Sequence, residues 1–309
     1  MSTINSKVAS LLLTYKNNPI LGIESLFGVT LDEQQRELVL AASDPEARVA
    51  VKSGQGCGKT SVFTWLTMLY LLTLEDCRIL ITAPSAQLLD RVFHAEFQKW
   101  FARLPEVFKG FFEVKKESVH IKGKPYQMAS LVTGNPSNIE GLQGGHATNY
   151  IIFGDEASGL EEPVFDTLLG TLGAGSGRFI LASNPIRNSG RFYEIFSSDN
   201  KRWKKITFSA LRSAQISKSW IDDMRSMYSE EDDNYQIRVL GEFGRFGEQQ
   251  FISSATIDSA VRNFLDFRHY SNFPKIAGVD VARFGGDQTV MTLRQGPKII
   301  DVTKYTNLD

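Results

Sequence analysis

Residues 53–60, Ser-Gly-Gln-Gly-Cys-Gly-Lys-Thr, have the composition and spacing of a loop that binds phosphate groups. An apolar run, Val49–Val51, precedes them and predicts a buried strand, and an apolar helix is expected to begin at Lys59. A strand, a glycine-rich turn and a helix in this order direct backbone N–H groups toward anionic oxygens. In such loops the lysine reaches the β- and γ-phosphates, and the hydroxyl of the next residue binds Mg²⁺.

One position departs from the G-x-x-x-x-G-K-[ST] pattern, because Ser53 stands where glycine is usual. The alternative interpretation is an ordinary glycine-rich turn that contains Gly-Lys-Thr by chance. The flanking strand and helix favour the nucleotide site. The predicted nucleotide-binding residues of the loop are Ser53, Gly54, Gln55, Gly56, Cys57, Gly58, Lys59 and Thr60.

A pair of acids, Asp155 and Glu156, ends a second apolar run about 95 residues after the loop. In a phosphate-loop enzyme, the first acid of such a pair holds the Mg²⁺ shell and the second polarises the attacking water. By itself a strand that ends in Asp-Glu is weak support, because turns are rich in acidic residues. The order of the two motifs predicts an ATP-hydrolysing site with Asp155 as metal ligand and Glu156 and Lys59 as catalytic residues.

Two further polar segments are candidates for nucleotide contact. Ser183 and Asn184 follow an apolar run, 178–182, at the place where a γ-phosphate sensor would lie, although a simple Asn-Pro turn explains them nearly as well. Gln34 and Gln35 lie in a helix predicted over 33–42, and a glutamine amide can bind both the donor and the acceptor edge of adenine. From the residues alone, an exposed helical glutamine is the favoured interpretation of this pair.

The elements that must position these residues alternate along the chain. Apolar runs predict strands, and amphipathic patterns predict helices between them. This alternation predicts an α/β fold, a P-loop ATPase with a mostly parallel sheet flanked by helices, and a ligand site at the carboxyl ends of the strands. The expected strands are 49–51, 78–83, 128–132, 150–157, 178–182 and 203–208, with a hairpin over 111–121; the expected helices are 4–17, 33–42, 59–69, 86–103 and 163–169.

The last third of the chain has a different pattern. Helices are expected over 219–227, 232–240 and 255–261, and a polar link leads to strands over 275–282, 289–293 and 298–302. Three adjacent strands with Asp280 in the first suggest the start of a ribonuclease-H-like sheet, whose carboxylates hold two metal ions. A capping or buried aspartate beside a hairpin turn is the alternative. The predicted domains are 1–200 (ATPase), 201–274 (linking subdomain) and 275–309 (start of a nuclease domain).

Composition excludes several classes of protein. With 309 residues, 42% apolar residues and a net charge of −1, the chain can fill a core and is not a general polyanion binder. Two cysteines provide neither a disulfide framework nor metal-ligand spacing, and no run of 18 apolar residues predicts a membrane span. Any nucleic-acid contact must come from local lysine clusters such as 109–124 and 201–205, for which a solvated face is an equal alternative.

The order of these pieces resembles the large subunit of tailed-phage terminases, the motor that packages viral DNA. The resemblance covers nearly the whole chain and implies an ATPase domain, a linking subdomain and a nuclease domain. It also implies double-stranded DNA, a portal protein and a small terminase subunit as partners, a homo-oligomeric ring, no membrane, and a location in the host cytoplasm and at the procapsid portal vertex. The matching pieces are 32–35, 53–60, 81–84, 141–144, 151–157, 183–185, 190–193, 239–243 and 278–287.

Carried over residue by residue, Gln35 is similar to the adenine-contacting glutamine, Ser183-Asn184 to the coupling motif, and Asp280 and Asp287 to nuclease metal ligands. Many terminases place an arginine near the phosphate loop or before the acidic pair, where this chain has Gln55, Cys57, Gln143 and His146. The remaining candidates for a charge-stabilising arginine are Arg178, Arg187 and Arg191.

Other functions share the same nucleotide motifs. A helicase and a nucleotide-switched binding module are the alternatives to a packaging motor. Because only Asp280 and Asp287 are available as nuclease ligands, no DNA cleavage is expected from this chain. The strands after residue 275 are expected to expose apolar side chains and an unpaired edge, and the tail to be mobile, protease-sensitive or paired with another chain. The positions expected to be exposed are Ile276, Val279, Val281, Ile299 and Ile300.

Overall fold

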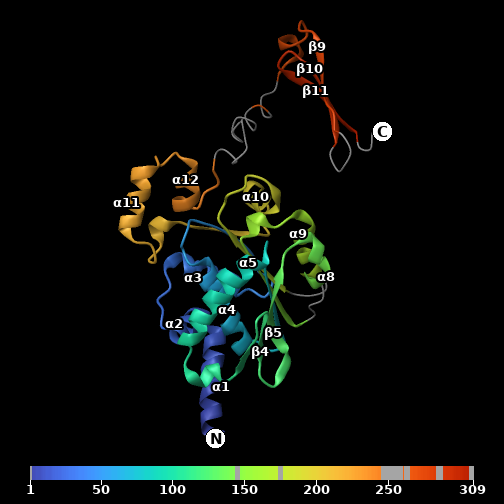
Figure 1. The fold of residues 1–309 in the computed structure, drawn as a ribbon. Helices are drawn as coiled ribbons and strands as arrows, with labels where there is room; N and C mark the ends of the chain where they lie inside the picture. The colour runs from blue at the N-terminus through green and yellow to red at the C-terminus, as the bar shows by residue number, and fades with distance from the viewer. Residues whose placement is uncertain are drawn as a thin grey trace. The chain divides into compact units, whose positions relative to one another are not determined.

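The computed structural model describes residues 2–142, 147–172, 177–244, 260, 265–282 and 288–305. The chain forms two compact units, Met1–Phe251 and Ile252–Asp309, which are described separately (Figure 1). The division into 1–200, 201–274 and 275–309 remains a prediction. In the described part of the chain, no helix has both the length and the apolarity that crossing a membrane requires.

An eight-stranded sheet forms the centre of the first unit, in the order β3-β4-β5-β2-β6-β7-β1-β8. The six strands from β5 to β8 in this order pair in parallel, whereas β3 and β4 pair antiparallel at one edge. The predicted mostly parallel α/β fold is therefore confirmed. The strands are β1 (Arg48–Ser53), β2 (Cys77–Ala83), β3 (Phe112–Val114), β4 (Ser118–Ile121), β5 (Lys124–Thr133), β6 (Asn149–Asp155), β7 (Gly177–Ser183) and β8 (Lys204–Phe208).

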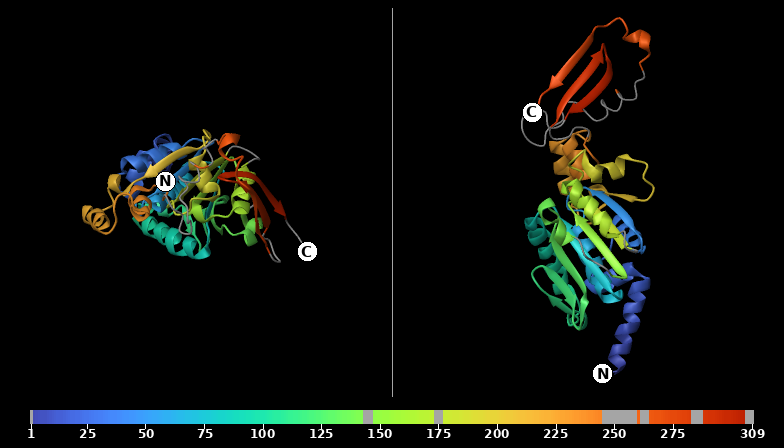
Figure 2. Two further views of the ribbon diagram at one scale, coloured as in Figure 1. Left: turned by 90° about the horizontal axis from the view of Figure 1, so that it is seen from above. Right: turned by 90° about the vertical axis from the view of Figure 1, so that its right-hand side faces the viewer.

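Helices cover both faces of this sheet, as the two views of Figure 2 show. Alternate residues of each central strand enter separate apolar cores: Val49 and Val51 of β1 belong to one core and Ala50 to the other. The larger core is covered by α1 (Ser2–Asn17), α2 (Pro19–Phe27), α3 (Glu33–Ala42), α4 (Lys59–Thr73) and α6 (Ala95–Arg103). The smaller is covered by α8 (Ile139–Leu142), α9 (Glu162–Thr171) and α10 (Gly190–Ser197).

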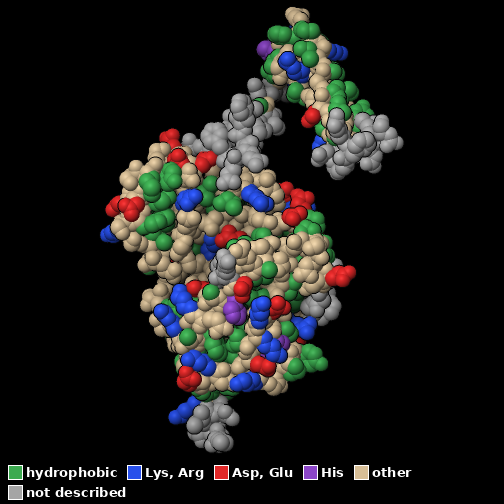
Figure 3. All heavy atoms as spheres, viewed as in Figure 1, with side chains coloured by type: hydrophobic (Ala, Val, Ile, Leu, Met, Phe, Trp, Pro, Cys, Tyr) green, Lys and Arg blue, Asp and Glu red, His purple; other side chains and the backbone are tan. Residues whose placement is uncertain are grey.

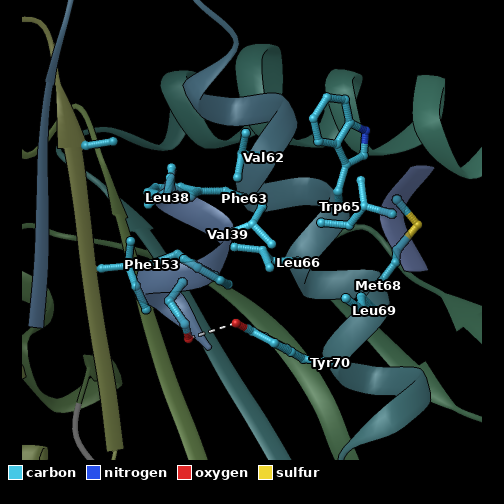
Figure 4. Close-up of a cluster of buried hydrophobic side chains, with 14 of the residues drawn as sticks. Leu38, Val39, Val62, Phe63, Trp65, Leu66, Met68, Leu69, Tyr70 and Phe153 are labelled. Carbon is cyan, nitrogen blue, oxygen red and sulfur yellow. Dashed lines mark hydrogen bonds between the residues drawn. The ribbon is translucent and has the colours of Figure 1, made fainter. Parts of the chain in front are cut away.

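Helix α4 is the most buried of the described helices, because every residue from Ser61 to Leu71 is buried. A helix that is apolar on all sides must be enclosed by other elements. Phe63 packs on Phe153 of β6 with ring centroids 4.7 Å apart, and the Tyr70 hydroxyl donates to the Ala42 carbonyl (Figure 4). The phosphate loop therefore leads into a helix that is held on every side.

Several elements differ from the sequence-based prediction. The helix expected over 86–103 is interrupted by a π-helical stretch, Leu89–His94, between α5 (Ala86–Leu88) and α6. The segment that follows β5, for which no element was predicted, contains a 3-10 turn, Pro136–Asn138, and α8. Helices α2 and α10 were not predicted, since each is short and lacks a long periodic pattern. Beyond the sheet lie α11 (Lys218–Met227), α12 (Asp233–Tyr235) and a π-helical turn, Gln236–Leu240.

The second unit contains an antiparallel sheet in the order β11-β10-β9, formed by β9 (Lys275–Asp280), β10 (Thr289–Gln295) and β11 (Lys298–Tyr305). The predicted strands are confirmed. The helix expected over 255–261 falls almost entirely outside the described residues. The predicted exposure is also confirmed: the relative accessibility is 43% or more at Ile276, Val279, Val281, Ile299 and Ile300.

Candidate nucleotide-binding site

The loop 53–60 joins the carboxyl end of β1 to the first residue of α4. Gly56 and Gly58 have φ values of 69° and 84°, which residues other than glycine rarely adopt. The first N–H groups of an α-helix have no intrahelical acceptor, and the helix dipole makes this end positive. The loop and the start of α4 therefore form an environment that suits phosphate oxygens.

Ser53 is accommodated although the usual pattern has glycine at its position. It is the last residue of β1 and is fully buried. Its Oγ donates to the Gly54 carbonyl at 2.7 Å, and its own carbonyl accepts from Asn184 Nδ2 at 2.7 Å. Extended strand backbone does not require glycine. Serine at this position is thus compatible with the loop, and it helps to hold the segment that follows β7.

Five of the predicted site residues meet at the carboxyl ends of β1, β6 and β7. Lys59 Nζ donates to Asn184 Oδ1 at 2.8 Å and lies 3.7 Å from Glu156 Oε1. Thr60 Oγ1 donates to Asp155 Oδ2 at 2.8 Å. Three sequence segments separated by tens of residues therefore converge on the start of α4, as the strand-end argument predicts.

Asp155 is 4% exposed, and burial raises the pKa of its carboxyl above the ordinary value. The neighbouring Glu156 carboxylate raises this pKa further, whereas Lys59 and the Thr60 hydroxyl oppose the shift. A hydroxyl and a carboxylate oxygen 2.8 Å apart are the kind of ligands that Mg²⁺ uses when substrate phosphates complete its shell. The described residues contain no group of three or more His, Cys, Asp or Glu that could hold a metal. Thr60 and Asp155 therefore fit a Mg²⁺ site that substrate phosphates complete, rather than one formed by protein ligands alone.

Glu156 has an unusual backbone, with φ 49° and ψ 43°. Non-glycine residues seldom occupy the left-handed region, and such residues cluster at functional sites. Its side chain is about one third exposed and accepts from Ser183 Oγ at 3.3 Å. Ser183 also contacts Ser158 Oγ at 2.7 Å. Ser158 was not singled out from the sequence, since an isolated serine carries no local signal.

Both glutamines of α3 are buried, at 2% exposure, so the exposed interpretation favoured from the sequence is wrong. The Gln34 side chain is used structurally, because its amide pairs with the backbone N–H and carbonyl of Ser209. Gln35 Oε1 accepts from the Asp32 N–H in a capping box. Gln35 Nε2 is buried without a partner among the described residues and lies beside Gly58, where an added Cβ would come within 2.8 Å of it.

A further glutamine reaches the same loop from a distant part of the chain. An added Cβ on Gly58 would lie 2.9 Å from Gln215 Oε1, so Gln215 packs against the loop at the start of α4. Gln215 belongs to the segment between β8 and α11. No local pattern in the sequence indicates this contact, because only the path of the chain after β8 creates it.

The candidate arginines differ in their surroundings. Arg178 is buried at the amino end of β7, where its guanidinium lies 5.4 Å from the Tyr70 ring centroid and donates to the Ser43 carbonyl at 3.4 Å. Arg178 is therefore a structural residue, at the opposite end of the strand from the site. Arg191 forms ion pairs with Asp166 and Glu194. Arg187 is exposed on the segment that follows β7. Gln143 and His146 lie outside the described residues.

The lysine clusters are partly neutralised. Lys109 pairs with Glu106 at 2.7 Å, and Lys115 with Glu113 at 3.3 Å. Lys204 pairs with Glu37 at 2.8 Å. On the face of the first unit that Figure 3 presents, basic and acidic side chains are interspersed. These pairs agree with the solvated-face alternative.

The predicted nuclease ligands do not form a described cluster. Asp280 ends β9 and is exposed, with Val290 as its cross-strand neighbour. Asp287 lies outside the described residues. The assignment of Asp280 and Asp287 to a metal site remains a prediction.

Comparison with known proteins addresses the terminase resemblance directly. No family model matches the chain. The chain is 25% identical over 296 residues to a protein of Enterobacteria phage P7 called "Probable terminase, large subunit", in a match that covers 92% of this chain and 60% of that protein. The resemblance to terminase large subunits is confirmed. The chain spans about 60% of the length of this terminase relative.

Solved terminase structures have the same fold. The large terminase of a thermophilic bacteriophage in complex with ADP matches with a TM-score of 0.55 and 14% identity, over 85% of this chain and 64% of that one. The large terminase ATPase domain of Thermus phage P74-26 matches with a TM-score of 0.52 and 18% identity, over 71% of this chain and 96% of that one. At these identities the terminase match concerns the fold, which is that of large-terminase ATPase domains.

Proposed function

We propose that the chain is an ATP-hydrolysing motor subunit that moves double-stranded viral DNA into a procapsid. The observation that carries the proposal is the convergence of Lys59 with Asn184 and Glu156, beside the contact between Thr60 and Asp155. Phosphoryl transfer is catalysed almost entirely by positioning and electrostatic stabilisation, which need a cation, metal ligands and a water-orienting acid in one place.

Each residue of this cluster has a proposed role. Lys59 and the amides of the loop hold the β- and γ-phosphates, and Asn184 senses the γ-phosphate. Thr60 and Asp155 hold Mg²⁺, which when bound neutralises charge on the phosphate oxygens. Glu156 accepts the proton of the attacking water. Gln35 contacts adenine, and its buried, unpartnered Nε2 supports this assignment.

The proposed assembly follows from the terminase resemblance. It consists of a ring of subunits with a portal protein and a small terminase subunit, in the host cytoplasm and at the portal vertex. Asp280 and Asp287 are proposed to contribute to a two-metal nuclease site, for which further carboxylates are needed. The expectation that this chain alone does not cut DNA remains a prediction.

The decisive experiment measures ATP turnover by the purified chain with and without duplex DNA. A motor is expected to hydrolyse ATP faster when duplex DNA is present, whereas a nucleotide-switched binding module would show no stimulation. Separation of a labelled strand from a duplex would instead indicate a helicase. Absence of ATP binding and hydrolysis under all conditions would contradict the proposed function.

A further inference from the structure

The segment Gly241–Gly244 follows the π-helical turn Gln236–Leu240 and lies against the phosphate loop. Gly241 has a φ of 70°, and an added Cβ would lie 2.5 Å from the Phe208 carbonyl oxygen and 2.7 Å from the Gly54 nitrogen. Real Cβ atoms do not approach other atoms this closely. Glycine is therefore required for this segment to reach the loop backbone.

Two amides of the loop are bonded to elements outside it. The Gly54 N–H donates to the Phe208 carbonyl of β8, and the Gln55 N–H donates to the Arg238 carbonyl, each at 2.8 Å. Arg238 lies in the turn that immediately precedes Gly241. These bonds set the path by which the chain leaves β1, and hence the position of the amides that follow.

The side chains of the segment surround Lys52, the residue before Ser53. Lys52 is 13% exposed and forms an ion pair with Glu242. Its Nζ lies 5.5 Å from the ring centroid of Phe196 and 5.8 Å from that of Phe243. A cation between an acid and two aromatic faces is attracted by all three groups. Glu242 and Phe243 therefore fix the residue from which the loop begins.

The same segment also packs against α10, the helix that follows Asn184. The Phe243 ring packs on Tyr193 and Phe196 of α10, with centroids 4.9 Å and 5.7 Å apart. Asn188 Nδ2 donates to the Gly244 carbonyl at 2.6 Å. Asn188 and α10 come shortly after the Asn184 that contacts Lys59. One segment thus contacts both sides of the candidate site: the start of the loop and the chain beyond the phosphate sensor.

We propose that Gly241–Gly244 is a positioning segment for phosphoryl transfer, in which Glu242 and Phe243 set the phosphate loop against Asn184. The inference rests on the proposed ATPase function. A displacement of about 1 Å in a catalytic group can cost about 10²-fold in rate, so loosening Lys52 lowers turnover more than it lowers nucleotide affinity. Because the contact is reciprocal, nucleotide binding in turn orders residues 236–243.

The test compares variants of the full chain. Phe243→Leu removes the ring but keeps an apolar side chain, Phe243→Tyr keeps the ring, and Glu242→Gln removes the charge. Glu230→Gln is the matched control, because Glu230 pairs with Arg225 in the same helical region and has no part in the site. Measurements are kcat and KM for ATP, the thermal midpoint, and hydrogen exchange of 49–60 and 236–243 with and without nucleotide.

For Phe243→Leu and Glu242→Gln, kcat is expected to fall about tenfold while KM changes less than about threefold. The thermal midpoint should stay near that of the wild type, and both variants should lose the nucleotide-dependent protection of 236–243. Phe243→Tyr and Glu230→Gln should behave as the wild type.

Two results would overturn the inference while leaving the ATPase intact. One is a kcat within about twofold of wild type in both variants. The other is a loss of kcat that follows the loss of folded protein, with protection of 236–243 unchanged, which would make the segment only a stabiliser of the fold. A wild-type chain that neither binds nor hydrolyses ATP would instead refute the proposed function, and the positioning role with it.

Discussion

Strands β6 and β9 both end in an aspartate that the sequence marks as a metal ligand, yet the structure gives the two residues different surroundings. Asp155 is 4% exposed and accepts a hydrogen bond from Thr60, beside Glu156. Asp280 is exposed at the end of a three-stranded sheet. The difference lies in the neighbouring groups: the strands beside β6 present complementary polar side chains at the same edge of the sheet, and this convergence makes Asp155 part of a candidate site.

The largest expected effect follows from removing the Lys59 cation of the candidate nucleotide-binding site. Lys59→Ala should lower ATP turnover below detection, a loss of about 10³-fold or more, because the lysine charge that helps to balance the β- and γ-phosphates is lost. Phosphate release assays measure this loss, and Lys99→Ala, at an exposed position of α6, is the control. Near-normal hydrolysis by Lys59→Ala would contradict the assignment of the ATPase site to the end of β6.

The next effect concerns the water-orienting acid. Glu156→Gln keeps the shape of the side chain but cannot accept a proton, so turnover should fall about 10²- to 10³-fold while ATP binding persists. Fluorescent nucleotide binding and single-turnover hydrolysis separate the two quantities. If binding and hydrolysis fall together, Glu156 is not the base.

A smaller effect is expected at the proposed metal ligand. Asp155→Asn should weaken Mg²⁺-dependent nucleotide binding by about tenfold, since the neutral amide contributes less to a divalent cation. A titration of nucleotide binding against Mg²⁺, with EDTA as the metal-free reference, reports this shift. Equal loss of binding in Asp155→Asn and Glu156→Gln would show that the two acids do not divide their roles.

The smallest effect is expected at Asp280, at the end of β9. Asp280→Ala should change ATP turnover by less than about twofold, because substitutions at exposed positions usually have small effects. The assay is the same as for Lys59→Ala. A large loss of ATPase activity would mean that the second unit contributes to the nucleotide site.

The sequence alone determined the α/β class, the positions of the main strands along the chain and the identity of the nucleotide motif. These features depend on short-range patterns in the sequence. The apolar run Val49–Val51 indicates a strand, and the glycines of 54–58 and Asp155 lie within the motifs that indicate the nucleotide site. Because the strands are parallel, their carboxyl ends share one edge, and this rule alone predicted the meeting of Lys59, Asp155 and Ser183-Asn184.

Only the tertiary structure decided how side chains of similar type are used. Gln34 and Gln35 are adjacent on one helix, yet the first pairs with the Ser209 backbone and the second keeps an unpartnered Nε2 beside Gly58. Arg178 is a candidate catalytic cation by type but is buried at the wrong end of β7. The contact of Gly241 with Gly54 joins residues nearly two hundred positions apart. Such choices depend on the three-dimensional path of the chain, because long-range packing brings together residues that no local pattern connects.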